Sequence, residues 1–99
     1  MERERDVEKY LKNRLEKMGC LFLKWVSPGN AGVPDRIVIF PNGHVWFVEV
    51  KTKTGHLTGL QAVWQRRLKE RQCGVFTVYG HDQAEEMAEA VGAILGAGR

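Results

Sequence analysis

The sequence predicts an α/β (α+β) domain with the element order αβββαβα, in which a mixed four-stranded sheet is flanked by helices. Apolar residues recur at helical spacing near both ends of the chain. Three short apolar runs separated by turn residues occupy the first half, and a helix followed by a strand occupies the second. With 43% hydrophobic residues in 99 positions, the chain is long enough for one core, so residues 1–99 are assigned to a single domain.

The first half is expected to form one helix and three strands. The helix is predicted over residues 4–18, where apolar residues follow one another every three or four positions until Gly19 interrupts the pattern. Apolar runs bounded by turn clusters predict strands at residues 20–26, 36–40 and 45–51. Because the links between these strands are short, the strands should form an antiparallel meander.

The second half is expected to add a helix, a strand and a final helix. Thr58 is the expected N-cap of the middle helix, whose inward face is predicted to carry Leu57, Leu60, Trp64 and Leu68. Residues 75–79 form the predicted fourth strand, which a right-handed crossover should place in the same sheet. Asp82 is expected to open the last helix, and residues 96–99 are expected to form a loose tail.

Composition excludes several classes of protein. No apolar run approaches the roughly 20 residues that span a bilayer, and the charged start is unlike a signal peptide, so a cytoplasmic protein without membrane contact is expected. Cys20 and Cys73 are expected to be reduced, and the isolated histidines offer no zinc-ligand spacing. Residues 20–80 carry eight basic and three acidic side chains, an excess that suits either a polyanionic partner or a solvated basic surface.

The segment from Asp35 to Lys51 contains the candidate metal-binding and catalytic residues. Asp35 precedes the second strand, while Glu49 and Lys51 lie two residues apart on the third and therefore point to the same face. The hairpin between the strands should bring Asp35 near Glu49. Two carboxylates that can hold a hard divalent cation, with a lysine beside them, suit hydrolysis of a phosphodiester. The alternative is a turn aspartate and an ion pair on a solvent-facing strand.

These residues also carry a resemblance to a known family. Val33-Pro34-Asp35 and Glu49-Val50-Lys51 resemble the PD-(D/E)XK nuclease signature. Together with Trp25-Val26-Ser27-Pro28-Gly29 before them and Leu57-Thr58-Gly59-Leu60-Gln61 after them, they are similar to the virus-type replication-repair nuclease (VRR-NUC) domain, in the stand-alone form found in phages and bacteria. The restriction-endonuclease-like core of that superfamily has the same αβββαβ order.

The resemblance implies a role for each matching residue. Asp35 and Glu49 would bind Mg²⁺ or Mn²⁺, and the backbone carbonyl of Val50 would add a ligand. Lys51 would orient or deprotonate the attacking water and stabilise the transition state, a task suited to a compact ammonium. No organic cofactor is implied.

Two further residues are catalytic candidates, each with a structural alternative. Gln61 would face the site, although with Thr58 it also fits a capping box, and the two roles are compatible. Glu8 has the spacing of a glutamate in archaeal Holliday-junction resolvases, where it helps to hold the metal through a water. Glu4, one turn earlier, is its rival, and Glu8 could instead pair with Lys12 on the helix surface.

The resemblance implies a metal-dependent, structure-selective DNA endonuclease that cleaves branched DNA, such as Holliday junctions, in DNA repair. One active site per chain and two cuts per junction favour a homodimer. Candidate phosphate contacts, each of which could equally lie on a solvated surface, are Arg36, Lys53, Arg66 and Arg67. Ser27 is a weaker candidate, because a structural role in the turn before the motif is favoured for it. The alternatives are a flap, nicking or restriction-like nuclease of the same fold, and a non-catalytic module that binds nucleic acid.

Overall fold

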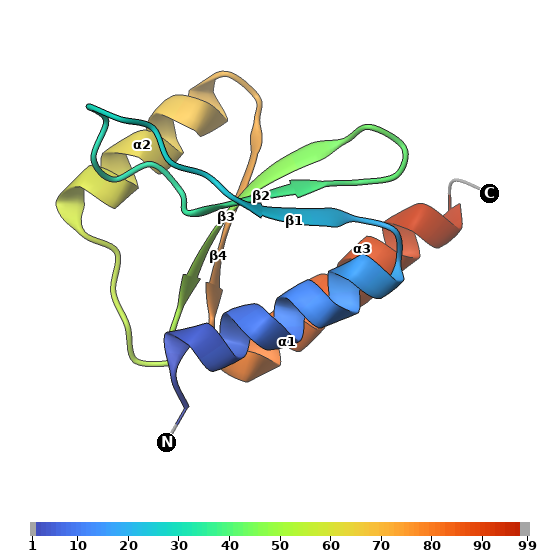
Figure 1. Ribbon diagram of the computed structural model, residues 1–99. Helices are drawn as coiled ribbons and strands as arrows, with labels where there is room; N and C mark the ends of the chain where they lie inside the picture. Colours follow the sequence, from blue (N-terminus) through green and yellow to red (C-terminus); the bar gives the residue numbers. More distant parts are fainter. Residues whose placement is uncertain (1, 98–99) are drawn as a thin grey trace.

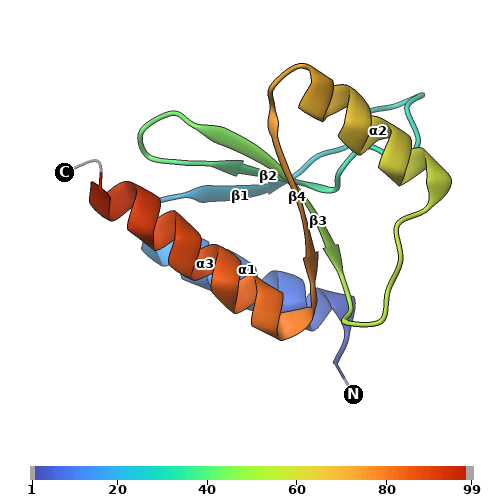
Figure 2. The ribbon, with the colours of Figure 1, turned by 180° about the vertical axis from the view of Figure 1, so that it is seen from behind.

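The computed structural model describes residues 2–97, which form a four-stranded sheet between helices (Figure 1). In chain order the elements are α1 (Glu4–Lys17), β1 (Leu21–Lys24), β2 (Arg36–Ile39), β3 (Val45–Lys51), α2 (Gly59–Glu70), β4 (Gly74–Tyr79) and α3 (Gly80–Ala97). Helices α1 and α3 lie side by side across one face of the sheet, and α2 lies on the opposite face (Figures 1 and 2). The predicted order αβββαβα is confirmed.

The sheet is mixed, as predicted. Strands β1, β2 and β3 form an antiparallel meander, in which Leu23 pairs with Ile37 and Ile37 with Phe47. Strand β4 runs parallel to β3 and places Thr77 beside Glu49. The spatial order is β1-β2-β3-β4, so β1 and β4 are the edge strands.

The core lies between the sheet and the layer formed by α1 and α3. Val7, Leu11 and Leu15 follow helical spacing on α1, and each is at most 1% exposed. They pack against buried valines of the sheet, including Val38, Val48 and Val50. Burial of Val48 and Val50, worth roughly 1.5–3 kcal/mol for each side chain, fixes the orientation of β3. Because side chains alternate along a strand, Glu49 and Lys51 must point to the opposite face.

Helix α2 differs from its prediction at one position. Leu60 is 57% exposed, whereas Gln65 is buried and its Nε2 donates a hydrogen bond to Thr77 Oγ1 at 2.6 Å. Leu60 lies five positions before Gln65, about 140° away around a helix, and therefore faces outward. The inward position predicted for Leu60 is wrong, while Trp64 and Leu68 are half-buried.

The boundaries of α3 also differ from the prediction. The helix begins at Gly80, directly after β4, and not at Asp82, because Gly80 adopts a φ of 82° that turns the chain sharply. The backbone N–H groups at this end are capped by other side chains: that of Tyr79 donates to Gln83 Oε1 at 2.9 Å, and that of His81 donates to Glu2 Oε2 at 2.9 Å. The helix continues to Ala97, so the loose tail predicted from residue 96 is wrong there, and residues 98–99 lie outside the described part of the chain.

Two expectations from composition can be compared with the structure. Cys20 is buried, Cys73 is half-buried, and both are free thiols, as expected. Within residues 2–97, no helix combines the length and the apolar character that a bilayer span requires.

Candidate active site

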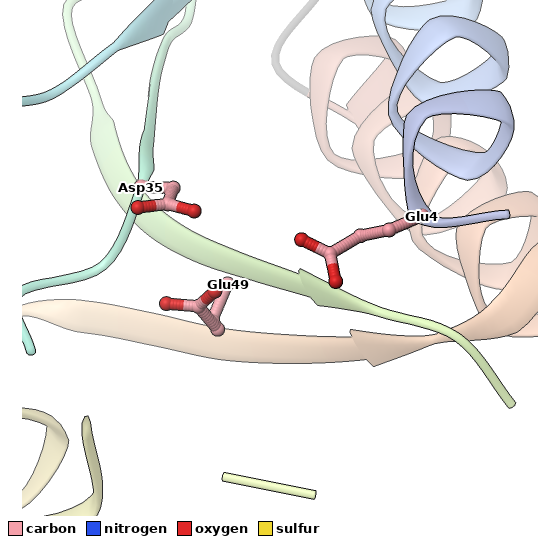
Figure 3. Close-up of side chains that lie close together, drawn as sticks. All are labelled: Glu4, Asp35 and Glu49. Atoms are coloured by element: carbon pink, nitrogen blue, oxygen red, sulfur yellow. The ribbon is translucent and has the colours of Figure 1, made fainter. Parts of the chain in front are cut away.

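Three carboxylates from separate parts of the chain meet where β2 begins and β3 ends (Figure 3). Glu4 belongs to the first turn of α1, Asp35 directly precedes β2, and Glu49 lies in β3. One oxygen from each carboxylate lies within 4.8 Å of the other two. Glu4 extends from its helix toward the other two side chains (Figure 3). Clustered carboxylate oxygens are the ligands that hard divalent cations prefer.

The loop before β2 holds Asp35 in place. The backbone N–H of Trp25, just after the end of β1, donates to the carbonyl oxygen of Asp35 at 2.7 Å, and the neighbouring Pro34 is fully buried. Gly32 has a φ of 96°, and a Cβ on it would lie 2.7 Å from backbone and side-chain carbons of Leu60. The loop therefore packs directly on the first turn of α2. Strand β1 ends at Lys24, short of the expected residue 26, as the chain enters this loop.

Glu49 is the most buried member of the cluster, with 1% of its surface exposed. Burial, followed by the negative charges of Asp35 and Glu4, raises the pKa of its carboxyl to about 7, while Lys51 opposes the rise. Its Oε1 is buried and has no hydrogen-bond partner. A buried carboxylate oxygen without a partner costs free energy unless a cation or a proton compensates it. The donor set and this unsatisfied oxygen fit a hard divalent cation.

The structure separates the two rival glutamates of α1. Glu4 joins the carboxylate cluster, whereas Glu8 contacts Arg36, whose Nη2 lies 2.5 Å from Glu8 Oε2. Lys12, the alternative partner considered for Glu8, contacts Glu16 at 3.1 Å. The first-helix acid beside Asp35 and Glu49 is therefore Glu4, not Glu8.

Gln61 forms the capping box that its spacing allows. Its backbone N–H donates to Thr58 Oγ1 at 3.2 Å, and its Oε1 accepts from the backbone N–H of Thr58 at 2.9 Å. Because Gly32 packs on Leu60 in the same turn, the turn that contains Gln61 adjoins the loop that ends at Asp35. A role for Gln61 in the site stays a prediction.

Comparison with known proteins agrees with this fold. The sequence profile of the nuclease-related domain (NERD) matches residues 1–98. A solved structure described as a VRR_NUC domain superposes with a TM-score of 0.82 at 37% sequence identity, covering 87% of this chain and 94% of the other. The chain belongs to the nuclease-related domain family and is of the VRR-NUC type.

A related phage protein is also named as a nuclease. "Putative nuclease p44" of Acyrthosiphon pisum secondary endosymbiont phage 1 is 51% identical over 49 residues, which make up 50% of this chain. The matched segment spans 53% of that protein, so the VRR-NUC chain corresponds to about half of its length.

The candidate phosphate contacts of the VRR-NUC chain lie in different settings. Ser27 Oγ accepts a hydrogen bond from Asn30 at 3.0 Å, and Arg36 is bound to Glu8. The remaining three side chains are exposed: Lys53, Arg66 and Arg67. The guanidinium carbon of Arg67 lies 4.4 Å from the centre of the Trp64 ring. Contact of any of them with DNA stays a prediction.

Gln65 and Glu2 support the site although their sequence positions did not predict it. Gln65 holds Thr77, the neighbour of Glu49 in the sheet, and its signal was its position four residues after Gln61 on the same helix face. The carboxylate of Glu2 accepts hydrogen bonds from the backbone N–H groups of His81 at 2.9 Å and Lys53 at 3.3 Å. It anchors the start of α1, and hence Glu4, but no local pattern could reveal a contact between residues so far apart.

Replacing Gly32 by alanine is expected to disturb the VRR-NUC site more than the same change at Gly29. Both glycines have positive φ, but a Cβ at Gly29 meets nothing within 4 Å, whereas one at Gly32 collides with Leu60. Gly29→Ala should cost about 1–2 kcal/mol of stability from backbone strain alone. Gly32→Ala should cost about twice that and also weaken Mn²⁺ binding, because Asp35 must move. Urea unfolding and calorimetric titration measure both effects, and equal results for the two variants would contradict the argument.

The roles of the two α1 glutamates can be separated by one pair of variants. Glu4→Gln is expected to weaken Mn²⁺ binding by about tenfold or more, because it removes a charged oxygen from the cluster. Glu8→Gln should leave Mn²⁺ affinity within about twofold, because its partner is Arg36. Isothermal titration calorimetry at constant pH measures both, and the reverse pattern would assign the metal role to Glu8.

Proposed function

We propose that this VRR-NUC chain is a Mg²⁺- or Mn²⁺-dependent endonuclease that hydrolyses phosphodiesters in branched DNA, such as four-way junctions. The observation that carries the proposal is the setting of Glu49, a buried carboxylate with an unpartnered Oε1 beside the carboxylates of Asp35 and Glu4. Such a cluster is costly in the absence of a compensating charge. Its residue types, and Lys51 two residues away, suit divalent-ion chemistry on a phosphate ester.

Each residue of the site has its own task in the proposed reaction. Asp35, Glu49 and Glu4 would hold the cation, with the backbone carbonyl of Val50 as a further oxygen ligand. A bound Mg²⁺ or Mn²⁺ would polarise the phosphoryl group and favour deprotonation of the attacking water. Lys51 shares the face of Glu49 on β3, from which its ammonium would orient that water and offset the charge on the phosphoryl oxygens.

Gln61 supplies a further donor in this proposal. Its Oε1 is occupied in the capping box, and within residues 2–97 its Nε2 makes no hydrogen bond. The amide NH₂ group is therefore free to donate to a phosphate oxygen while the helix remains capped. The structural and the functional role of Gln61 are compatible.

The proposal includes a two-fold homodimer, because one site per chain must make two cuts in a junction. Apolar side chains remain exposed on the sheet face opposite α1 and α3, with Leu21 at 53%, Leu23 at 46% and Val45 at 42%. A second copy packed on this face would bury them. Sedimentation should show a dimer for the wild type and a monomer for Leu23→Glu, and a strictly monomeric wild type would count against this part.

The direct test is cleavage of a labelled four-way junction beside a linear duplex and a flap of matched sequence. Each substrate is incubated with Mg²⁺, Mn²⁺, Ca²⁺ or EDTA, for the wild type and for Asp35→Asn. Metal-dependent cutting of the junction in preference to the other substrates, lost in Asp35→Asn, is the expected result. Cutting of all three alike would leave a nuclease without structure selectivity, and binding without cutting in every metal would support the non-catalytic alternative.

A further inference from the structure

A second charged feature lies between α1 and the strands β1 and β2. A pocket of about 210 Å³ is lined by four cations, one carboxylate and one aromatic ring: Arg5, Lys9, Lys12, Arg36, Glu8 and Phe22. We propose that this pocket binds a backbone phosphate of the DNA, next to the phosphate that is cleaved. This inference rests on the proposed function, since it assigns part of the path of the same substrate.

The pocket retains positive charge that the protein itself does not neutralise. Within residues 2–97, Arg5 and Lys9 take part in no ion pair, and the buried Nε of Arg36 has no hydrogen-bond acceptor. Glu8 compensates part of the charge of Arg36 through Nη2, and Lys12 contacts Glu16. Arg5, Lys9 and Lys12 are exposed, so their charged groups can reach a phosphate at the mouth of the pocket.

The pocket and the carboxylate cluster draw residues from the same two segments of the chain. Arg5 follows Glu4 on α1, and Arg36 follows Asp35 at the start of β2. Arg5, Lys9 and Lys12 are spaced at i, i+4 and i+7, so they form one row along the helix. That row is about 10 Å long, comparable with the rise of about three nucleotides on one DNA strand. A DNA strand that leaves the cluster at Glu4 and follows α1 would bring its next phosphates over this row.

The charges of the neighbouring helix indicate the direction of this path. Helix α3 packs beside α1 and carries an exposed group of carboxylates, Asp82, Glu85, Glu86 and Glu89. These side chains repel a polyanion, whereas the α1 row attracts it. The phosphate path therefore leaves the site along the side of α1 that faces β1 and β2, away from α3.

The test measures DNA binding without cleavage. A labelled linear duplex is titrated in Ca²⁺ by fluorescence anisotropy at several salt concentrations, with the wild type, Lys9→Gln, the double variant Arg5→Gln/Lys9→Gln and the control Lys69→Gln. Lys69 is an exposed lysine of α2, on the opposite face of the sheet, so the control removes the same charge elsewhere. Lys9→Gln should weaken binding by about three- to tenfold and reduce the slope of log K against log salt by about one. The double variant should lose more.

Glu8→Gln is expected to change DNA affinity in the opposite direction. Removing the only carboxylate of the pocket should tighten DNA binding, whereas a purely structural role of the Glu8–Arg36 pair would weaken it or leave it unchanged. Equal weakening by Lys9→Gln and Lys69→Gln would overturn the proposal, as would unchanged binding of the double variant. If the wild type cleaves DNA but the pocket variants bind like it, only this inference fails. If the wild type neither binds nor cleaves DNA, the proposed function fails with it.

Discussion

Replacing Glu49 by glutamine is expected to make the metal-free protein more stable at pH 8 and, at the same time, to abolish cleavage. Burial and the charges of Asp35 and Glu4 raise the pKa of Glu49 from 4.5 to about 7 in the folded protein. Between these two values the folded state binds more protons than the unfolded state. The stability of the wild type should therefore fall as the pH rises from 4.5 to about 7, and remain low above it.

The expected stabilisation by Glu49→Gln at pH 8 is on the order of 3 kcal/mol, because the neutral amide avoids the cost of a buried charge. In a domain of this size, that raises the melting temperature by on the order of 10 °C. Urea unfolding in EDTA between pH 5 and pH 8 measures the effect. Glu89→Gln, the same change on the exposed surface of α3, is the control and should show no comparable pH dependence. A stability difference that is the same at pH 5 and pH 8 would contradict the argument.

The same variant should respond differently to metal. Mn²⁺ binds the folded wild type and should raise its melting temperature, whereas Glu49→Gln has lost one of the three carboxylates and should show a smaller increase. A variant that is more stable without metal, gains less from metal and no longer cuts DNA would be difficult to explain by misfolding. Retained cleavage in Glu49→Gln would remove Glu49 from the proposed reaction.

Lys51→Ala is expected to reduce the cleavage rate by about 10²–10³ while leaving DNA binding in Ca²⁺ nearly unchanged. Lys51 shares the face of Glu49 on β3, so in the proposed reaction its ammonium would act on the reacting phosphate and not on the distant parts of the DNA. Single-turnover cleavage and anisotropy measure the two effects separately. Lys51→Arg should restore little activity, because a planar guanidinium is larger than an ammonium and differently shaped.

Lys53→Ala is the matched control for Lys51→Ala. Lys53 lies just beyond the end of β3 and is exposed, so its loss should weaken DNA binding slightly and leave the single-turnover rate of bound substrate unchanged. Equal loss of binding and cleavage in Lys51→Ala would show that Lys51 holds the substrate and would sink its assignment to the chemical step.

Helical periodicity could not show which glutamate of α1 joins the carboxylate cluster. Glu4 and Glu8 lie one turn apart on nearly the same helix face, so helical spacing alone gives both access to the sheet. Glu4 reaches the cluster because Glu2 ties the start of α1 to α3, near the end of β3. Glu8 instead forms an ion pair with Arg36, the first residue of β2. Both contacts join residues that are distant in the chain.

The buried face of α2 was also not predictable from the helix sequence alone. The hydrophobic pattern predicted that Leu60 faces the inside of the fold. In the structure, α2 turns Gln65 toward Thr77 and begins with the capping box of Thr58 and Gln61, and in this orientation Leu60 is exposed. A buried glutamine is favourable only when it has a partner. That partner lies on β4, so the packing of the helix on the sheet could not be deduced from the helix alone.

By itself, the sequence determined the element order, the mixed sheet, and the alignment of Asp35 with Glu49 and Lys51. These features follow from local periodicity and from the length of one hairpin, which act over a few residues. Only the tertiary structure decided that Glu4 joins the carboxylates, and that one basic pocket is lined from α1, β1 and β2. Those features depend on how distant elements pack. A helix that slides by one turn along its axis still presents the same pattern of side chains to the sheet, so the pattern alone does not fix its position.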